Sequence, residues 1–256
     1  MKKLNNIFDT HAHYEDEDFD DDRDKLLSSL PSKGISGVIC CGTTLLSSYS
    51  ALELSKKYDY MYAACGIYPH ESINMRKGDM DVIKEMLSDK KAVAVGEIGL
   101  DYHYDDAPRE LQLETFEEFL KMANDTDKPV IVHDREAHED TLSLLKKYRP
   151  RGVIHCFSGS IEIMNEIMKL GMYIGLGGAV TFKNAKKSLL AAAQVPSDRL
   201  LLETDAPYMT PVPMRGQRNT SDLISFTAEC IAGIRGTDAQ SICDMTNDNA
   251  HKLFGI

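Results

Sequence analysis

Two histidines stand two residues apart near the start of the chain, in the segment 7–13 (IFDTHAH). In an extended strand, successive side chains alternate between the two faces, so we expect His11 and His13 to point the same way, with Asp9 behind them. Two neutral imidazoles placed in this way can bind one divalent metal ion, and a nearby carboxylate such as Asp9 could fix their tautomers. A metal site nevertheless needs three or four ligands, so the pair is informative only if the chain supplies the others.

Eight short apolar runs divide the chain, and each is continuous rather than alternating. Such runs are typical of strands in a parallel sheet that is buried on both faces, and helical patterns lie between them here. The 256 residues also match the usual size of a (β/α)8 barrel. We therefore predict a TIM-like barrel that forms a single domain over residues 1–256, followed by helices at 222–235, 238–247 and 249–253. The runs are residues 7–8, 37–41, 60–65, 92–95, 130–132, 152–154, 172–176 and 200–202.

Residues that can bind metals follow five of these runs. In a barrel of parallel strands, chemistry takes place at the C-terminal ends of the strands, where the loops after each strand meet. Six residues with nitrogen or oxygen ligand atoms, drawn from five strand ends, indicate a metal site rather than a chance arrangement. These six are His11 and His13 after the first run, Glu97 after the fourth, His133 after the fifth, His155 after the sixth and Asp205 after the eighth.

The composition of this set favours two metal ions. Imidazole and carboxylate ligands without a thiolate suit zinc, manganese, iron, nickel or magnesium. Four histidines and two carboxylates exceed one tetrahedral shell, and paired ions usually share a carboxylate and a water or hydroxide. We assign Glu97 as the shared carboxylate and Asp205 as the group that takes a proton from the attacking water. One ion would then have His11, His13 and Asp205 as ligands, and the other would have His133 and His155.

Five segments together resemble the TatD family of metal-dependent deoxyribonucleases, within the amidohydrolase superfamily. They are residues 9–13 (DTHAH), 96–102 (GEIGLDY), 129–135 (PVIVHDR), 155–159 (HCFSG) and 202–208 (LETDAPY). The resemblance runs nearly from end to end. It implies a TIM-like barrel, a divalent-metal site made of the six residues named above, and hydrolysis of DNA phosphodiesters.

The chain departs from the family pattern at three places. Tyr68 stands where the family usually has the first histidine of Gly-x-His-Pro-His, and Asp134 replaces a small residue between His133 and Arg135. Thr220 and Ser221 replace the usual Glu-Pro. None of the three removes a predicted metal ligand, so they bear on the substrate contacts.

Six residues are candidates for those substrate contacts. Arg135 follows a metal ligand by two residues, so it would point into the same mouth and could bind a phosphate. His70, which follows Pro69, is a candidate from the resemblance alone. The other four are equally consistent with structural roles: Asp101, Tyr102, Ser158 and Arg218.

The leading hypothesis is a deoxyribonuclease, acting as an exonuclease at DNA strand ends through a metal-bridged hydroxide. An amidohydrolase or ester hydrolase that acts on a small molecule or an aminoacyl ester is an alternative, because similar ligand sets serve those reactions. A metal-binding scaffold with little catalysis is a second alternative.

Charge and apolar content limit the partners and the location. With 29 basic and 40 acidic residues, the net charge is −11, which argues against a broad basic surface for nucleic acid or membrane. A phosphate must then be bound locally. No apolar run approaches 18 residues, and no signal sequence is evident, so we expect a cytoplasmic protein with six reduced cysteines.

Overall fold

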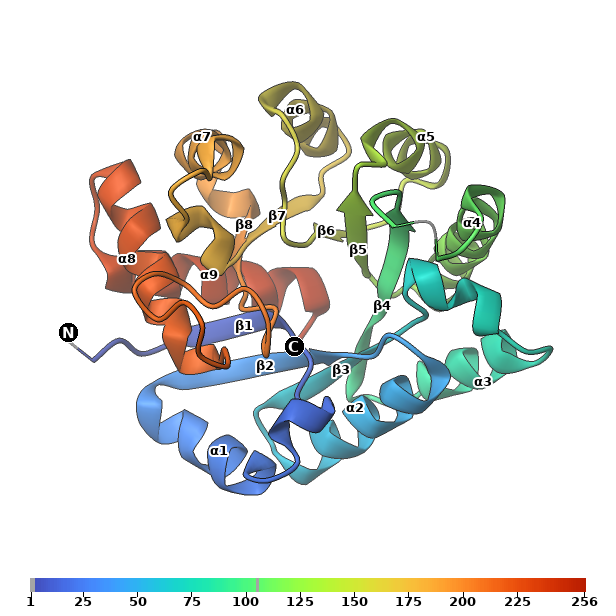
Figure 1. The fold of residues 1–256 in the computed structure, drawn as a ribbon, viewed down its shortest axis with the longest axis horizontal. Coiled ribbons are helices and arrows are strands. Elements are labelled where there is room, and N and C mark those ends of the chain that lie inside the picture. Colours follow the sequence, from blue (N-terminus) through green and yellow to red (C-terminus); the bar gives the residue numbers. More distant parts are fainter. Residues whose placement is uncertain (1–2, 105) are drawn as a thin grey trace.

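Eight parallel strands curl into a nearly closed barrel that is surrounded by helices (Figure 1). The structure is a computed structural model, and it describes residues 3–104 and 106–256. The strands pair in chain order, and each of the eight predicted apolar runs overlaps one of them, which confirms the predicted barrel. The strands are β1 (Ile7–Ala12), β2 (Ile35–Cys41), β3 (Met61–Cys65), β4 (Ala92–Asp101), β5 (Val130–Arg135), β6 (Gly152–Ile154), β7 (Tyr173–Leu176) and β8 (Leu200–Leu202).

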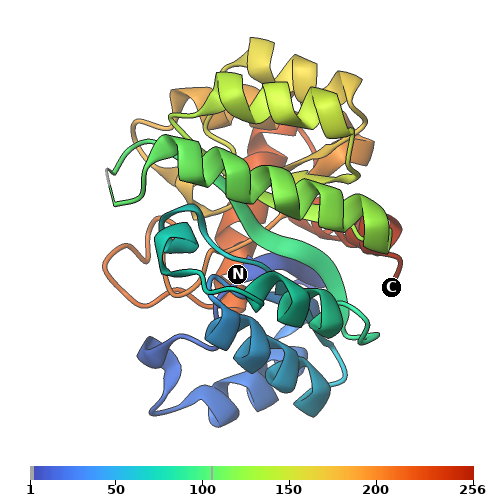
Figure 2. The ribbon, with the colours of Figure 1, turned by 90° about the vertical axis from the view of Figure 1, so that its right-hand side faces the viewer.

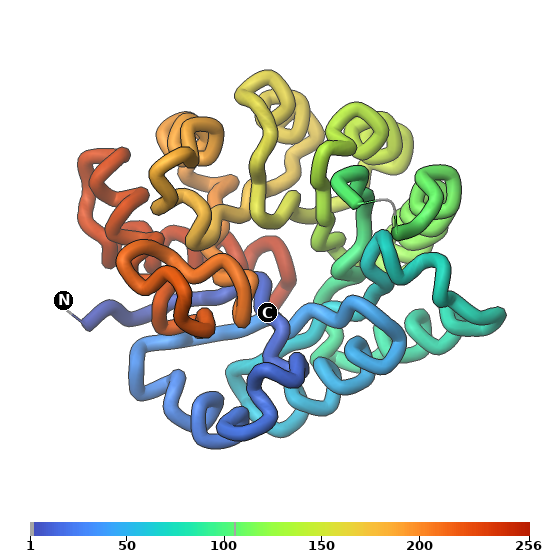
Figure 3. The backbone as a smooth tube through the Cα atoms, viewed as in Figure 1, coloured from blue at the N-terminus to red at the C-terminus, as the bar shows by residue number. Residues whose placement is uncertain are grey.

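Helices follow the strands around the outside of the barrel, as the tube in Figure 3 traces. Their apolar faces pack against the strands, which explains why the strands read as continuously apolar. The helices are α1 (Arg23–Ser29), α2 (Leu45–Lys57), α3 (Asp79–Met86), α4 (Arg109–Thr126), α5 (His138–Tyr148), α6 (Ile161–Lys169), α7 (Lys186–Gln194), α8 (Ile224–Arg235) and α9 (Ala239–Phe254).

The interior of the barrel is filled with apolar side chains, and α9 covers one end of it. One cluster of buried residues contains a member from each of the eight strands, such as Phe8 of β1 and Leu201 of β8. Ala250, Leu253 and Phe254 of α9 belong to the same cluster. Figure 2 shows the C-terminus at the end of the barrel opposite the loops that follow the strands. The loops at the other end are thus left to form a site.

The seam between β1 and β8 is joined just beyond the end of β8. Asp205 donates its backbone N–H to the carbonyl of His11 at 2.9 Å, and His13 donates its own to the carbonyl of Ala206 at 2.7 Å. The Asp9 carboxylate adds bonds from the backbone N–H and the hydroxyl of Thr204, at 2.9 and 2.6 Å. Closing the barrel therefore brings the first and last predicted ligands side by side.

Strands β4 and β5 extend further than the apolar runs predict. The run 92–95 continues as β4 to Asp101, and the run 130–132 continues as β5 to Arg135, with Gly99 opposite His133. Polar residues and two glycines hide this extension in the sequence. Gly99 is required there, because its φ is +141° and a Cβ would lie 2.0 Å from the His133 carbonyl oxygen.

The C-terminal helices differ from the prediction. Helix α9 runs unbroken from Ala239 to Phe254, whereas the sequence predicted a break near residue 248. Asn249 lies inside the helix, where its side-chain amide donates to the carbonyls of Ser197 and Leu200 at 2.8 and 2.9 Å. Tertiary hydrogen bonds thus override the weak helix propensity of asparagine.

The acidic segment 15–22 is anchored to the barrel. Phe19 is fully buried, and the guanidinium of Arg218 lies over its ring at 4.6 Å. Arg23 donates to the carbonyl of Tyr14 at 2.6 Å. An apolar anchor and two arginines therefore hold the segment, while the side chains of Glu17, Asp18, Asp20 and Asp21 remain exposed. All six cysteine thiols are free. Among the described helices, none has the length and apolar character that crossing a bilayer requires.

We expect Gly99→Ala to lower the free energy of unfolding by roughly 1–3 kcal/mol, because the new Cβ would collide with the β5 backbone. Gly233→Ala is the matched control, since a Cβ there meets no described atom within 4 Å and the site lies in α8. Denaturant unfolding of both variants measures the difference. Equal stability of the two variants would contradict the requirement for glycine at position 99.

Candidate metal centre

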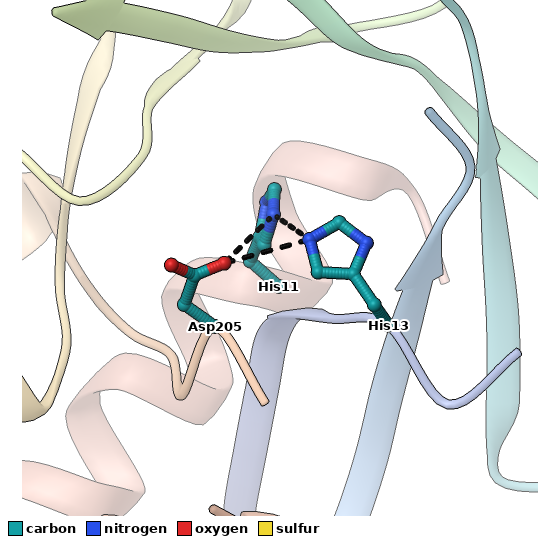
Figure 4. A group of neighbouring side chains, drawn as sticks. All are labelled: His11, His13 and Asp205. Atoms are coloured by element: carbon teal, nitrogen blue, oxygen red, sulfur yellow. Dashed lines mark hydrogen bonds and ion pairs between the residues drawn. The ribbon is translucent and has the colours of Figure 1, made fainter. Parts of the chain in front are cut away.

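The six predicted ligands converge at the C-terminal end of the barrel. Figure 4 shows how His11 and His13 turn toward each other, with Asp205 beside them. The two Nε2 atoms are 3.0 Å apart, and Asp205 Oδ1 lies 3.7 Å from that of His11 and 3.4 Å from that of His13. The register of β1 against β2 shifts between Asp9 and Ala12, so strict alternation does not hold along the strand. The two imidazoles converge nevertheless.

Glu97 lies between two groups of ligands. Its Oε2 is 3.3 Å from His11 Nε2 and 3.6 Å from His13 Nε2. Its Oε1 is 2.9 Å from His133 Nδ1 and 2.8 Å from His155 Nε2. One carboxylate oxygen thus faces the group that includes Asp205, and the other faces the remaining two histidines. This is the geometry that a carboxylate shared by two cations requires.

In His13 and His133, one ring nitrogen is hydrogen-bonded away from the centre of the site. This bond determines which of the two nitrogens of each ring has a free lone pair. His13 donates through Nδ1 to the Cys41 carbonyl at 2.7 Å, so its Nε2 is an acceptor. His133 Nε2 lies 3.1 Å from Asp101 Oδ2, so its Nδ1 is the acceptor that faces Glu97. Acceptors that face carboxylates in a buried space need a cation between them. The residues present therefore fit divalent metal ions.

Without metal, protons must supply this positive charge. Burial opposes protonation of His133, but the Asp101 and Glu97 carboxylates outweigh it and raise its pKa to about 9. Burial likewise opposes protonation of His155, and Glu97 outweighs it, which raises the His155 pKa. Burial and the neighbouring His155 lower the pKa of His11 to about 4. Protons and metal ions thus compete for the same nitrogen atoms.

Asp101 lies behind His133 rather than at a substrate. It is completely buried, and its Oδ2 accepts hydrogen bonds from the Tyr68 hydroxyl at 2.7 Å and from His133. Its Oδ1 accepts from the backbone N–H of His103 at 2.9 Å. The expectation of a substrate contact at Asp101 is corrected, because both carboxylate oxygens are occupied inside the protein.

Asp9 does not orient the imidazoles, contrary to the expectation from its spacing. Its Oδ1 accepts from the backbone N–H groups of His11 and Thr204, at 3.3 and 2.9 Å. Its Oδ2 accepts from the hydroxyls of Thr204 and Ser221, both at 2.6 Å. The carboxylate therefore holds the backbone of β1 in place, while the Cys41 carbonyl orients His13.

Glu203 is a buried acid beside the site that the sequence analysis did not single out. Its side chain accepts from the backbone N–H of Cys156, and its Oε2 has no hydrogen-bond partner among the described residues. Burial raises its pKa to about 8, so it is mostly protonated at neutral pH. The only feature of the sequence that could have pointed to Glu203 is its position two residues before Asp205. That position alone does not indicate a metal ligand.

Five of the six predicted ligands line a cleft of about 540 Å³ at the barrel mouth, and the sixth, His11, is fully buried beneath it. Arg135 and Ser158, two of the predicted substrate contacts, also line it. The guanidinium of Arg135 lies over the ring of Tyr104 at 5.0 Å. His70 lies next to the cleft, with its Nε2 at 3.3 Å from the Asp101 carbonyl oxygen and its ring edge-on to Tyr68.

Two other predicted substrate contacts lie outside this cleft. Tyr102 donates its hydroxyl to Asp140 at 2.8 Å, and the guanidinium of Arg109, the first residue of α4, lies over its ring at 4.2 Å. Arg218 donates to Asp22 at 2.7 Å and to the carbonyl of Asp18 at 2.6 Å. An outer helix and the acidic segment therefore already bind these polar groups, which is the structural role that the sequence left open for both residues.

Comparison with known proteins gives matches along nearly the whole chain. The profile of a family described as "TatD related DNase" matches residues 8–255. Bacillus subtilis has a protein named "Uncharacterized metal-dependent hydrolase YabD" that is 39% identical over 253 residues, covering 98% of this chain and 99% of that protein. The Citrobacter rodentium protein named "3'-5' ssDNA/RNA exonuclease TatD" is 32% identical over 260 residues, covering 98% of each chain. The crystal structure of the TatD homologue YJJV from Escherichia coli has a TM-score of 0.92 at 32% identity, over 98% of both chains.

We expect metal binding to release protons at pH 7, because the pKa values of His13, His133 and His155 are raised in the metal-free site. The apparent affinity should rise with pH and level off above about 9, where His133 has lost its proton. Calorimetry in two buffers of different ionisation enthalpy counts the protons.

His138→Gln is the control for this experiment, since His138 pairs with Asp134 at 2.7 Å outside the group of ligands. It should leave the proton release unchanged. A metal affinity that did not vary between pH 6 and 8 would contradict the competition between protons and metal ions.

Proposed function

The chain belongs to the TatD related DNase family of metal-dependent hydrolases, and we propose that it removes nucleotides from the ends of single-stranded DNA or RNA. It would act as a single catalytic domain in the cytoplasm. The observation that carries the proposal is the position of Glu97, whose two oxygens face two separate groups of nitrogen and oxygen ligands. Two adjacent cations suit phosphodiesters, because the attacking and leaving oxygens both carry charge.

The six ligands would hold two divalent ions, of zinc, manganese, nickel or magnesium. His11, His13 and Asp205 would hold one, His133 and His155 the other, and Glu97 both. When bound, the ions supply a nucleophile at neutral pH and neutralise the charge on the phosphate. The protein contributes a rigid and largely dry frame, since the side chains of His11, Glu97 and His155 are at most 4% exposed.

Asp205 is the ligand best placed to move a proton. Its side chain is 19% exposed, more than any of the other five, and it lies at the cleft. Burial favours its neutral form, but His13 and the other imidazoles outweigh this and hold its pKa below the ordinary value. It is therefore ionised at neutral pH and can accept the proton of the attacking water, as a general base must.

The charge of the protein favours a short substrate footprint. Around the cleft, Arg135 supplies a cation, whereas Glu15, Asp16, Glu71 and Asp134 supply carboxylates. A long polyanion would be repelled by this rim, but one strand end needs only the ions and Arg135 to neutralise the phosphates near the cleaved bond. The proposal therefore favours an exonuclease over an endonuclease.

We expect Glu97→Gln to reduce kcat at least 100-fold and to lower the number of bound ions, because the amide nitrogen cannot bind a cation. Arg135→Ala should instead raise KM about tenfold and leave metal binding intact, since a charge-assisted hydrogen bond contributes roughly 1.5 kcal/mol or more. Kinetics with an oligonucleotide, together with elemental analysis, separate the two effects. Normal kcat with full metal loading in Glu97→Gln would refute the shared-carboxylate role.

We expect cleavage to require a free strand end. Two or three phosphate contacts on a single strand give a slope of log K against log salt of roughly −1.5 to −2. A labelled oligonucleotide and its circular form test the first point, and an inactive Asp205→Asn variant measures the slope. Efficient cutting of the circle would point to an endonuclease. Turnover of small esters or amides alone would favour the amidohydrolase alternative.

A further inference from the structure

Tyr68 lies in the cleft but is not one of the six candidate ligands, so the proposed metal centre gives its phenol no role. It begins the turn after β3, and it stands at the position where the family pattern usually has a histidine. Its hydroxyl donates to Asp101 Oδ2 at 2.7 Å and lies 3.2 Å from His133 Nε2. Its ring packs edge-on to that of His133, with the centroids 4.8 Å apart. The phenol therefore contacts both Asp101 and His133.

Both carboxylate oxygens of Asp101 accept hydrogen bonds from within the protein. One oxygen accepts from the His103 backbone N–H, while the other accepts from both Tyr68 and His133. The carboxylate is completely buried, so water cannot replace a lost donor at its surface. The Tyr68 hydroxyl thus fixes the rotation of the carboxylate that in turn fixes the imidazole.

His133 differs from the other three imidazoles in the atom that it turns toward the centre. His11, His13 and His155 present Nε2, whereas His133 presents Nδ1 to Glu97 at 2.9 Å. This orientation requires the ring proton to sit on Nε2, facing Asp101. The other tautomer would turn an N–H toward Glu97, and a flipped ring would turn a C–H there; either would block a cation.

We propose that Tyr68 is a positioning residue for one of the two metal positions. Its hydroxyl locks Asp101, and Asp101 locks His133 with the Nδ1 lone pair facing Glu97 and His155. The inference rests on the proposed metal centre and concerns only the ion held by His133 and His155. His11, His13 and Asp205 make no hydrogen bond to Tyr68 among the described contacts, so the other ion does not depend on the phenol.

Tyr68→Phe removes the hydroxyl and keeps the ring. We expect the affinity for one ion to fall about tenfold or more, as is typical when the hydrogen-bond partner of a ligand is lost, while the affinity for the other ion stays within a few-fold. Titration with zinc against a competing chelator measures both affinities without turnover. In kinetics at limiting metal, kcat should fall while KM for the oligonucleotide stays nearly constant.

Two further variants separate positioning from a general structural effect. Tyr58→Phe also removes a phenol that donates to an aspartate, Asp24 at 2.9 Å, but at an exposed place outside the cleft, and it should change neither affinity. In an Asp101→Asn background, Tyr68→Phe should cause no further loss, because both changes act through the same carboxylate. Thermal unfolding of each variant shows that the barrel remains folded.

The imidazole protons give a second readout. In the zinc-loaded protein, ¹H–¹⁵N spectra should show His133 protonated on Nε2 and His11, His13 and His155 protonated on Nδ1. Tyr68→Phe should broaden or shift the His133 signal alone. Two unchanged affinities, an equal loss of both ions, or losses that add in the double variant would overturn the inference. A wild type that binds no metal would instead refute the proposed function itself, and the inference with it.

Discussion

The structure depends on one constraint. In the candidate metal centre, imidazole nitrogens and carboxylate oxygens face one another in a space from which water is nearly excluded. His133 Nδ1 faces a carboxylate oxygen at 2.9 Å, and His13 Nε2 faces another at 3.4 Å. Such an arrangement is costly unless positive charge lies between the acceptors, because burial removes the water that would otherwise solvate them. Much of the surrounding structure holds this set in place: the Cys41 carbonyl orients one ring, Asp101 orients another, and Asp9 holds the backbone from which the first pair of ligands projects.

The extended pair β4–β5 gives the centre its asymmetry. Glu97 and Asp101 come from the same strand, yet they face different groups. Glu97 lies between the imidazoles of the candidate centre, whereas Asp101 lies behind His133. The difference follows from their surroundings, since Asp101 is enclosed by Tyr68 and the His103 backbone. A single strand that carries both acids is possible because Gly99 lets β5 approach closely between them.

Much of the barrel could be predicted from the sequence, because continuous apolar runs reflect burial on both faces of each strand. The convergence of the six candidate ligands could be predicted in the same way, since each follows such a run. What the sequence hid depends on tertiary contacts. The polar end of β4 is stabilised by its pairing with β5, and Asn249 stays helical because two distant carbonyls accept its protons. The sequence could not show that Asp140 binds Tyr102 or that Asp22 binds Arg218, because these partners lie far away along the chain.

The ligands divide equally between the two halves of the barrel. His11, His13 and Glu97 lie on β1 to β4 or directly after β1, and His133, His155 and Asp205 lie on or directly after β5, β6 and β8. Neither half alone contains a complete ligand set, and the Asp205–His11 backbone bond joins the two halves at the seam. Bound ions would therefore connect the two halves of the barrel. With metal bound, the barrel would unfold as one cooperative unit and would resist separation into half-barrel fragments.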